Sequence, residues 1–209
     1  RQNSMKNRNP EKIKEQITLG TRRLVAAGGM SNFSFPKLSA ETGIAAPTVY
    51  EHYKNKEDLL TSCYLAIDAE IGALLSGFLQ NDPPHRHELE KIDVYCRALW
   101  AAYWRYLTAD ADRTLFYWSF YHSEYYTQAV AARSIPNYRT LEAFMDALDK
   151  RFHISERHDS GVLVANMIDG SVNAAVRVLR GEFSGDDRTL NTIYQTVIQP
   201  LFSVLGLRI

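Results

Sequence analysis

The sequence predicts an all-α protein with two parts, a small N-terminal domain at residues 5–56 and a larger helical domain at residues 57–209. Apolar residues recur at helical spacing along the chain, Ser and Pro residues mark helix starts, and Gly residues mark helix ends. No segment alternates convincingly between apolar and polar residues, as a half-buried strand would. The 209 residues, 45% hydrophobic and 23% charged, are enough to form a sizeable core.

The first helix is expected at about residues 10–28. Pro10 suits the first turn of a helix, and Gly28 and Gly29 end it because glycine tolerates the left-handed conformation at helix C-termini. One helical face carries the apolar residues Ile13, Ile17, Leu24 and Val25.

Two short helices follow. Ser34 caps the first one, just before Pro36, and Gly43 ends it. Pro47 begins the second, which runs to about residue 53. A longer helix followed by two short helices around a tight Gly-containing turn is a helix-turn-helix unit. Its apolar core would be Leu38, Ile44, Val49 and Tyr53.

Residues 54–58 break the apolar pattern, and a long helix at about residues 59–79 then joins this unit to the rest of the chain. Charge also divides the chain here. Residues 1–56 hold 10 Lys and Arg against 4 Asp and Glu, whereas residues 57–209 hold 14 against 20. The N-terminal part therefore suits a polyanion, and a merely soluble basic surface is the alternative.

Residues 43–60, GIAAPTVYEHYKNKEDLL, resemble the recognition segment of the TetR family of bacterial transcriptional regulators. The family pattern is Gly-Val-Ser-x-x-Thr-Leu-Tyr-x-His-Phe-x-x-Lys-Glu-x-Leu, and this chain departs from it at Ala45, at Tyr53 and, in the preceding helix, at Ser39. The resemblance covers about residues 10–60 and continues beyond them only in length and helical layout. It implies an N-terminal three-helix helix-turn-helix DNA-binding domain and a larger helical ligand-binding and dimerisation domain.

The second short helix supplies most of the residues expected to contact DNA. Its first turn offers backbone N–H groups and the positive end of the helix dipole to a phosphate. Thr48, Tyr50 and His52 can donate hydrogen bonds to the DNA backbone, and Lys54 and Lys56 add positive charge. The candidates for reading bases are short side chains, which can contact thymine methyls, and a carboxylate, which can accept from a cytosine amine: Ala46, Pro47, Thr48 and Glu51.

Two further residues and one alternative complete this interface. Ser34 and Lys37, at the start of the preceding helix, are also expected to contact DNA. Core packing is the alternative for the two tyrosines. We expect it for Tyr53, which follows Val49 by one helical turn, whereas Tyr50 is expected to face DNA.

An aromatic segment at residues 95–126 contains 12 of the 24 Phe, Tyr and Trp residues of the chain, including all 3 tryptophans. So many rings are hard to pack without gaps or unpaired hydroxyls, which predicts a ligand cavity. Plain core packing and an aromatic seam between two copies are the alternatives. Ring faces favour a planar or cationic ligand. The expected lining residues are Trp100, Tyr103, Trp104, Tyr117, Tyr121 and Glu124.

A polar row interrupts the apolar helix expected at residues 160–181. Asn166, Asp169 and Asn173 share one face, and Arg177 extends the row. Such groups are solvated, paired across an interface or exposed in a cavity. We expect the first three residues to line the ligand cavity, with Asp169 or Glu124 pairing with a cationic group.

The resemblance implies that this helix and the last one, at about residues 186–206, pair with their copies in a four-helix bundle, so that the protein is a homodimer. Small residues would allow the helices to approach closely: Gly170, Ser171, Ala174 and Ala175. The function implied is a repressor that binds a palindromic operator in double-stranded DNA and is released by a small aromatic or cationic effector. A ligand-independent DNA-binding protein with a filled C-terminal core is the alternative.

Enzymatic and membrane functions are not indicated. The sequence has no P-loop, no GxGxxG and no GxSxG motif, and residues 85–88 (HRHE) read as a solvated loop rather than a metal site. Cys63 and Cys96 lack metal-site spacing and are expected to be reduced thiols. We therefore expect a cytoplasmic protein with no cofactor, no metal and no membrane segment.

Overall fold

The computed structural model describes residues 9–81, 89–151 and 158–204, and within these ranges every regular element is a helix. The predicted all-α class is confirmed. The α-helices are α1 (Pro10–Gly28), α2 (Phe35–Thr42), α3 (Ala46–His52), α4 (Lys56–Asn81), α5 (Leu89–Ala109), α6 (Ala111–Tyr121), α7 (Gln128–Ser134), α8 (Arg139–Arg151), α9 (Ser160–Leu179), α10 (Asp187–Ile193) and α11 (Gln199–Val204).

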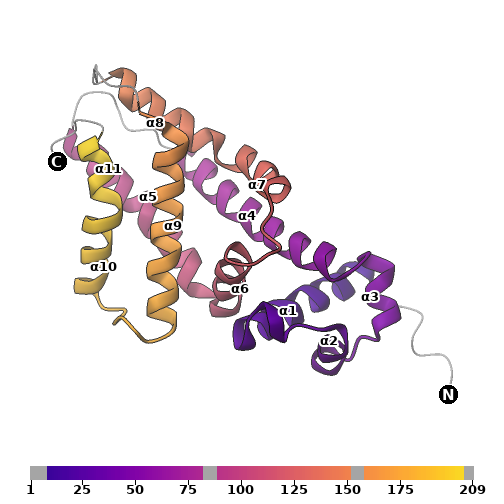
Figure 1. Ribbon diagram of the computed structural model, residues 1–209. Helices are drawn as coiled ribbons and strands as arrows, with labels where there is room; N and C mark the ends of the chain where they lie inside the picture. The colour runs from indigo at the N-terminus through magenta and orange to yellow at the C-terminus, as the bar shows by residue number, and fades with distance from the viewer. Residues whose placement is uncertain (1–8, 82–88, 152–157, 205–209) are drawn as a thin grey trace.

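The helices form an elongated molecule in which α4 connects the two ends. Figure 1 shows α1, α2 and α3 together at one end, α8, α9, α10 and α11 toward the other, and α4 running between them. Helix α6 lies against α1, so the N-terminal helices also touch the larger part of the chain directly.

Local signals set the bounds of the first three helices. The Asn9 side chain caps α1 by accepting from the Glu11 backbone N–H at 3.0 Å, and Ser34 caps α2 by accepting from the Lys37 N–H at 3.4 Å. Gly43 follows α2 with a φ of 70°, a left-handed conformation that favours glycine. The expected helix-turn-helix core is present, with three residues buried and Tyr53 half-buried against them: Leu38, Ile44 and Val49.

Helix α4 begins at Lys56, earlier than the predicted residue 59. Asn55 accepts a hydrogen bond from the Asp58 N–H at 2.8 Å, and the Asp58 carboxylate accepts from the Lys54 N–H at 2.9 Å. This reciprocal capping turns the polar residues 54–58 into a helix start, which the apolar pattern alone does not reveal.

The small residues of α9 are not free for a second copy. Ser171, Ala174 and Ala175 are buried within the chain, and a Cβ on Gly170 would lie 2.7 Å from Val197. The prediction that these small residues pack between subunits is therefore wrong, because they are covered within the chain: Gly170 faces Val197 of the C-terminal segment, and Ser171 accepts from the Trp100 indole N–H at 3.2 Å. That segment is α10, a π-helical turn (Tyr194–Ile198) and α11.

Two helices, α4 and α9, contain windows long and apolar enough to cross a membrane by length and composition, contrary to the expectation that no such run exists. About half of each window is buried inside the chain, 56% for α4 and 50% for α9. Buried core helices pass the same test, because they too need apolar residues on most faces.

We predict opposite effects for two Gly→Ala changes inside helices. Gly77→Ala should stabilise the protein by about 0.5–1 kcal/mol, since alanine favours helix and the added Cβ would meet nothing within 4 Å. Gly170→Ala should lower stability, because its Cβ must displace Val197. Urea unfolding at one fixed protein concentration measures both. Equal stabilisation by the two changes would contradict the close packing of α9 on the C-terminal segment.

Candidate nucleic-acid interface and effector cavity

Helix α3 presents one face to solvent and one to the core. Val49 is buried, whereas Pro47 and Glu51 are exposed and the side chain of Tyr50 is 57% exposed. Ala46 and Thr48 are half-buried, and Ala45 before them provides no side-chain cap. The Thr48 N–H donates to the Ala45 carbonyl at 3.0 Å, and Pro47 has no N–H, so Ala46 carries the one uncapped N–H among these three residues. The face that the sequence predicted to meet DNA is thus an exposed one.

Tyr50 is held in place rather than mobile on the surface. Its ring meets the ring of Phe35, the first residue of α2, edge to face with centroids 4.9 Å apart. Tyr53 packs half-buried against the core, as predicted. The contact with Phe35 fixes the direction of the exposed Tyr50 ring.

The other predicted DNA contacts fall into two groups. Lys37, in α2, and Lys54, between α3 and α4, are exposed. His52 is partly exposed at the end of α3. Ser34 is partly exposed, but its hydroxyl already caps α2.

Lys56 is placed differently from the exposed lysines. It is half-buried and donates to the Met30 carbonyl at 3.4 Å. Its ammonium lies 5.8 Å from the ring centroid of Phe33 and 5.6 Å from that of Tyr125, which belongs to the larger domain. In this conformation Lys56 links the two parts of the chain.

Further polar contacts join the N-terminal helices to the larger domain. Arg23 of α1 pairs with Glu41 at 2.6 Å and lies 3.8 Å from Asp112 at the start of α6. Arg22 lies 3.9 Å from Glu70 of α4, which also accepts from the Tyr106 hydroxyl at 2.6 Å. The orientation of α1 therefore depends on α4 and α6.

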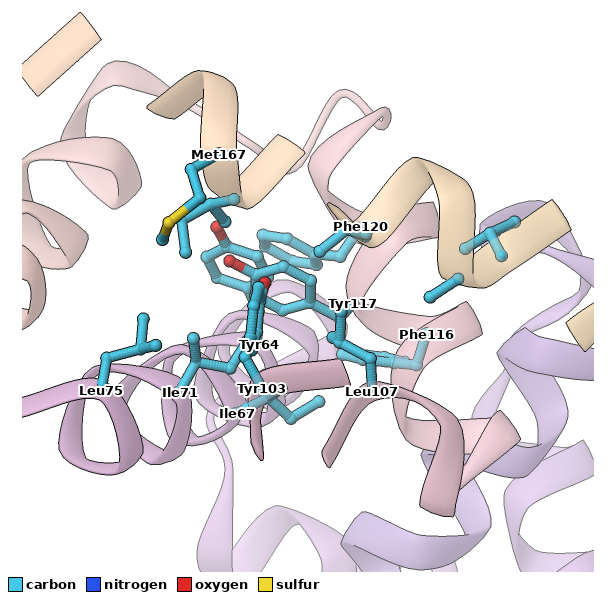
Figure 2. Close-up of a cluster of buried hydrophobic side chains, with 14 of the residues drawn as sticks. Tyr64, Ile67, Ile71, Leu75, Tyr103, Leu107, Phe116, Tyr117, Phe120 and Met167 are labelled. Atoms are coloured by element: carbon cyan, nitrogen blue, oxygen red, sulfur yellow. The ribbon is translucent and has the colours of Figure 1, made fainter. Parts of the chain in front are cut away.

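The larger domain contains a cavity of about 190 Å³ between α4, α6, the α7 region, α8 and α9. Its described lining is rich in tyrosines and carboxylates: Tyr64, Tyr117, Tyr121, Tyr126, Tyr138, Asp68, Glu142 and Asp169, with Ala131, Ser134, Ile135, Gly161, Val164, Ala165 and Ile168. Figure 2 shows Tyr64, Tyr117 and Phe120 gathered in one aromatic cluster with Tyr103 beside them.

Asp68 is fully buried and anchors one wall of this cavity. One carboxylate oxygen accepts from the hydroxyls of Tyr117, at 2.8 Å, and Tyr138, at 2.7 Å. The other accepts from the Asn137 amide at 2.7 Å and from the Ser134 hydroxyl. Four neutral donors thus hold a buried carboxylate, which is the condition under which burying it is tolerable.

The tyrosines of the cavity stack on one another. The Tyr64 ring lies 4.8 Å from Tyr117 and 4.6 Å from Phe120, nearly parallel to both. Tyr126 meets Tyr64 edge-on, and lies 4.6 Å from Tyr121. Both faces of Tyr64 are therefore occupied, while Tyr121 and Tyr126 form a half-buried pair closer to solvent.

Burial shifts the ionisation of these groups. It raises the pKa values of Tyr64, Tyr117 and Tyr138, and the nearby Asp68 charge raises them further. Burial also raises the pKa of Asp169, although the hydrogen bond from the Tyr121 hydroxyl, at 3.2 Å, acts in the opposite direction. Negative charge at Asp169 is therefore destabilised by burial.

Only part of the predicted ligand-binding set lies around this cavity. Tyr117, Tyr121 and Asp169 line it. Trp100 and Tyr103 line a second, apolar space of only about 20 Å³, and Trp104 packs on Trp100 with ring centroids 5.3 Å apart. The expectation that the tryptophans share a cavity with Tyr121 is not met, because they face the chain's own C-terminal segment.

The polar candidates also separate. Glu124 and Asn166 are exposed, and Asn173 accepts from the Trp118 indole N–H at 2.7 Å. The other lining residues were missed, among them all the remaining tyrosines and acids: Tyr64, Asp68, Tyr126, Tyr138 and Glu142. A weak signal was present, because Asp68 and Glu70 are two acids in the middle of a largely apolar helix, of which the structure buries only Asp68. The HRHE segment lies outside the described residues, and no metal-binding cluster occurs within them.

Comparison with known sequences matches the helix-turn-helix region. Residues 17–63 match the family model described as "Bacterial regulatory proteins, tetR family". An uncharacterised HTH-type transcriptional regulator of Haemophilus influenzae is 44% identical over 48 residues, which are 23% of this chain and 26% of that protein. An HTH-type regulator of Staphylococcus aureus is 27% identical over 81 residues, 39% of this chain and 42% of that protein. These matches thus span less than half of either relative.

Comparison with solved structures extends the likeness of the fold to most of the chain. A TetR family transcription regulator from Marinobacter aquaeolei superposes with a TM-score of 0.67 at 20% identity, covering 90% of this chain and 95% of that one. The regulator FadR from Bacillus subtilis, solved in complex with stearoyl-CoA, gives a TM-score of 0.60 at 14% identity, covering 88% and 97%.

We predict that two Asp→Asn changes in the cavity wall differ in sign. Asp68→Asn should lower the free energy of unfolding by about 1–3 kcal/mol, because an amide group would face donors that now share a carboxylate. Asp169→Asn should leave stability unchanged or raise it at neutral pH, since it removes a charge that burial disfavours.

The pH dependence provides the check. Because the pKa of Asp169 is raised in the native state, this carboxyl keeps its proton to higher pH there than in the unfolded chain. As pH rises and Asp169 ionises, its buried charge therefore lowers the stability of the wild-type protein. Any gain from Asp169→Asn should therefore vanish in acid, where Asp169 is protonated. Denaturation curves at several pH values measure it, and equal losses for both variants would contradict the assigned environments.

Proposed function

We propose that this protein, a TetR-family transcriptional regulator with a DNA-binding helix-turn-helix, represses transcription as a cytoplasmic homodimer and leaves its operator when a small effector enters the tyrosine-lined cavity. The helix-turn-helix carries the proposal, since the family match at residues 17–63 coincides with the exposed face of α3. We infer no catalytic activity.

The proposed DNA contacts follow from exposure. Pro47, Thr48, Tyr50 and Glu51 occupy the accessible face of α3, which would enter the major groove. Around it, Ser34, Lys37, His52 and Lys54 would contact phosphates, and Ala46 would lie at the groove edge. Lys56 would reach DNA only after leaving the Met30 carbonyl and the Tyr125 ring.

The cavity supports effector control over the alternative of a ligand-independent protein with a filled core. One of its walls is α4, which carries Tyr64 and Asp68 and begins at Lys56, immediately after the helix-turn-helix. An effector that favours one position of α4 would therefore change the position of α3. It must bind the DNA-free conformation more tightly, because only differential affinity shifts the equilibrium.

The Bacillus subtilis FadR structure contains stearoyl-CoA, so an acyl-CoA is one candidate class of effector. The cavity of this chain supports a different class. Carboxylates would repel the phosphates of an acyl-CoA, and the purely apolar space of about 20 Å³ has room for about one water molecule. A small aromatic or cationic effector suits the tyrosine-lined cavity better.

The first test concerns DNA. Lys54→Ala should weaken binding to operator and to unrelated duplex alike and reduce the salt slope by about one, because it removes one phosphate contact. Tyr50→Ala should weaken binding as well. Binding isotherms at several salt concentrations, on an operator selected from random duplexes, measure this. Lys150→Ala, exposed on α8, is the control, and a Lys54 variant that matches it would remove Lys54 from the interface.

The second test concerns the dimer, for which we propose the exposed faces of α9 and the C-terminal segment. Val162 is 54% exposed on α9, and an arginine there would disrupt a subunit interface without entering the core. Val162→Arg should give monomers that bind operator weakly, whereas Val94→Arg, at a residue 67% exposed on α5, should remain dimeric. Sedimentation equilibrium separates the cases, and a wild-type-like dimer in the Val162 variant would refute this interface.

A further inference from the structure

The charge of the cavity wall narrows the chemistry of its ligand. Three carboxylates line it, those of Asp68, Glu142 and Asp169. Its described lining contains no Lys, Arg or His, although His122, whose ring lies 5.2 Å from that of Tyr121, is close enough to Asp169 to lower its pKa. We infer that the cavity binds a compact organic cation, an ammonium compound, through Asp169, Tyr121 and Tyr126. This inference rests on the proposed function only for its regulatory consequence, since the binding itself can be measured without DNA.

The three carboxylates have different roles. Asp68 already accepts four hydrogen bonds, which fix the side chains of the cavity wall. It would therefore attract a cation through its negative charge and not through a direct hydrogen bond. Asp169 accepts one hydrogen bond among the described residues, from Tyr121, and remains half-buried at the edge of the cavity. A cation beside Asp169 would compensate a charge that burial destabilises.

The aromatic rings favour the same ligand. Tyr121 and Tyr126 lie 4.6 Å apart with their planes at 48°, and neither is sandwiched as Tyr64 is. The face of an electron-rich ring attracts a cation, and the attraction increases as the site is shielded from water. A carboxylate next to two tyrosines therefore offers a cation both charge compensation and ring contacts.

The size and charge of the cavity exclude other classes. At about 190 Å³ it is smaller than the roughly 300–1,000 Å³ typical of drug-sized ligands, so the cation is compact. A neutral planar ring would displace water from the carboxylates without compensating them. An anionic ligand would be repelled by the three carboxylates in the lining.

Calorimetry on the full-length protein tests the inference with matched probes. The probes are choline, benzylamine and benzyltrimethylammonium, a neutral isostere of each, such as 3,3-dimethylbutan-1-ol for choline, and stearoyl-CoA. At least one cation should bind at least about tenfold more tightly than its isostere, a difference equivalent to about 1.4 kcal/mol. Isosteres or stearoyl-CoA that bind as tightly as the cations, or the absence of binding by every cation, would overturn it.

Variants separate charge from shape. Asp169→Asn should weaken the cation about tenfold or more and leave its isostere unaffected, whereas Asp187→Asn, an exposed acid on α10, should change neither. Tyr121→Phe keeps the ring and should cost less than Tyr121→Leu. Equal loss of cation and isostere in the Asp169 variant would show a damaged cavity rather than charge recognition.

Operator release distinguishes this inference from the proposed function. A cation that binds with this charge dependence but leaves operator affinity unchanged would support the site and refute effector control by it. Release by a neutral or anionic compound, with cations inactive, would support effector control and refute the cation site.

Discussion

The buried carboxylate of Asp68 is the interaction on which the rest of the larger domain depends. Its two oxygens accept hydrogen bonds from side chains of α6, α7 and the short helix that follows α7 (Ile135–Tyr138). Because Asp68 belongs to α4, these bonds attach all three elements to α4. Removing any one donor would leave a buried anion less compensated, at a cost of about 1–3 kcal/mol. The same bonds fix the rings of Tyr117 and Tyr138, which shape the cavity wall.

Helix α4 connects this hub to the helix-turn-helix, and only residues 53–55 separate it from α3. The helix that carries Asp68 begins at Lys56, whose ammonium contacts the Met30 carbonyl on one side and the Tyr125 ring on the other. Tyr125 is adjacent in sequence to Tyr126, which lines the cavity. A ligand packed against Tyr121 and Tyr126 would therefore act on both the middle of α4 and its first residue. The contacts of Arg22 and Arg23 couple α1 to the same elements.

The helix-turn-helix was predictable from sequence because its signals are local. Asn9 and Ser34 cap helices that begin at the next residue, and Gly43 ends the helix that precedes it. The family pattern in addition indicates which residues of the second short helix face DNA. The start of α4 was missed because capping by Asn55 and Asp58 depends on side-chain geometry and not on apolar spacing.

The cavity could be predicted only in part, because it is built from distant segments. The excess of aromatic residues at 95–126 indicated a gap, and Tyr117 and Tyr121 do line it. The sequence could not show which helix would cover each face. Trp100 and Trp104 therefore looked equivalent to Tyr121, although they pack toward Ser171 and Tyr194 instead. The small residues of α9 were misassigned for the same reason, since close approach to the chain's own helices and to a second copy requires the same residue types.

We propose that occupancy of the cavity moves the recognition helices through α4. The most direct measurement is the distance between spin labels on the two copies of Glu51→Cys in the dimer, by pulsed electron resonance. Cys63 and Cys96 should not take up label, because both are buried and burial raises the pKa of each thiol to about 12. We expect a bound cation to change this distance in the spin-labelled protein that is otherwise wild type. The same cation should leave the distance unchanged when Asp169→Asn is also present. Without that substitution, an unchanged distance at saturating cation would contradict the proposal.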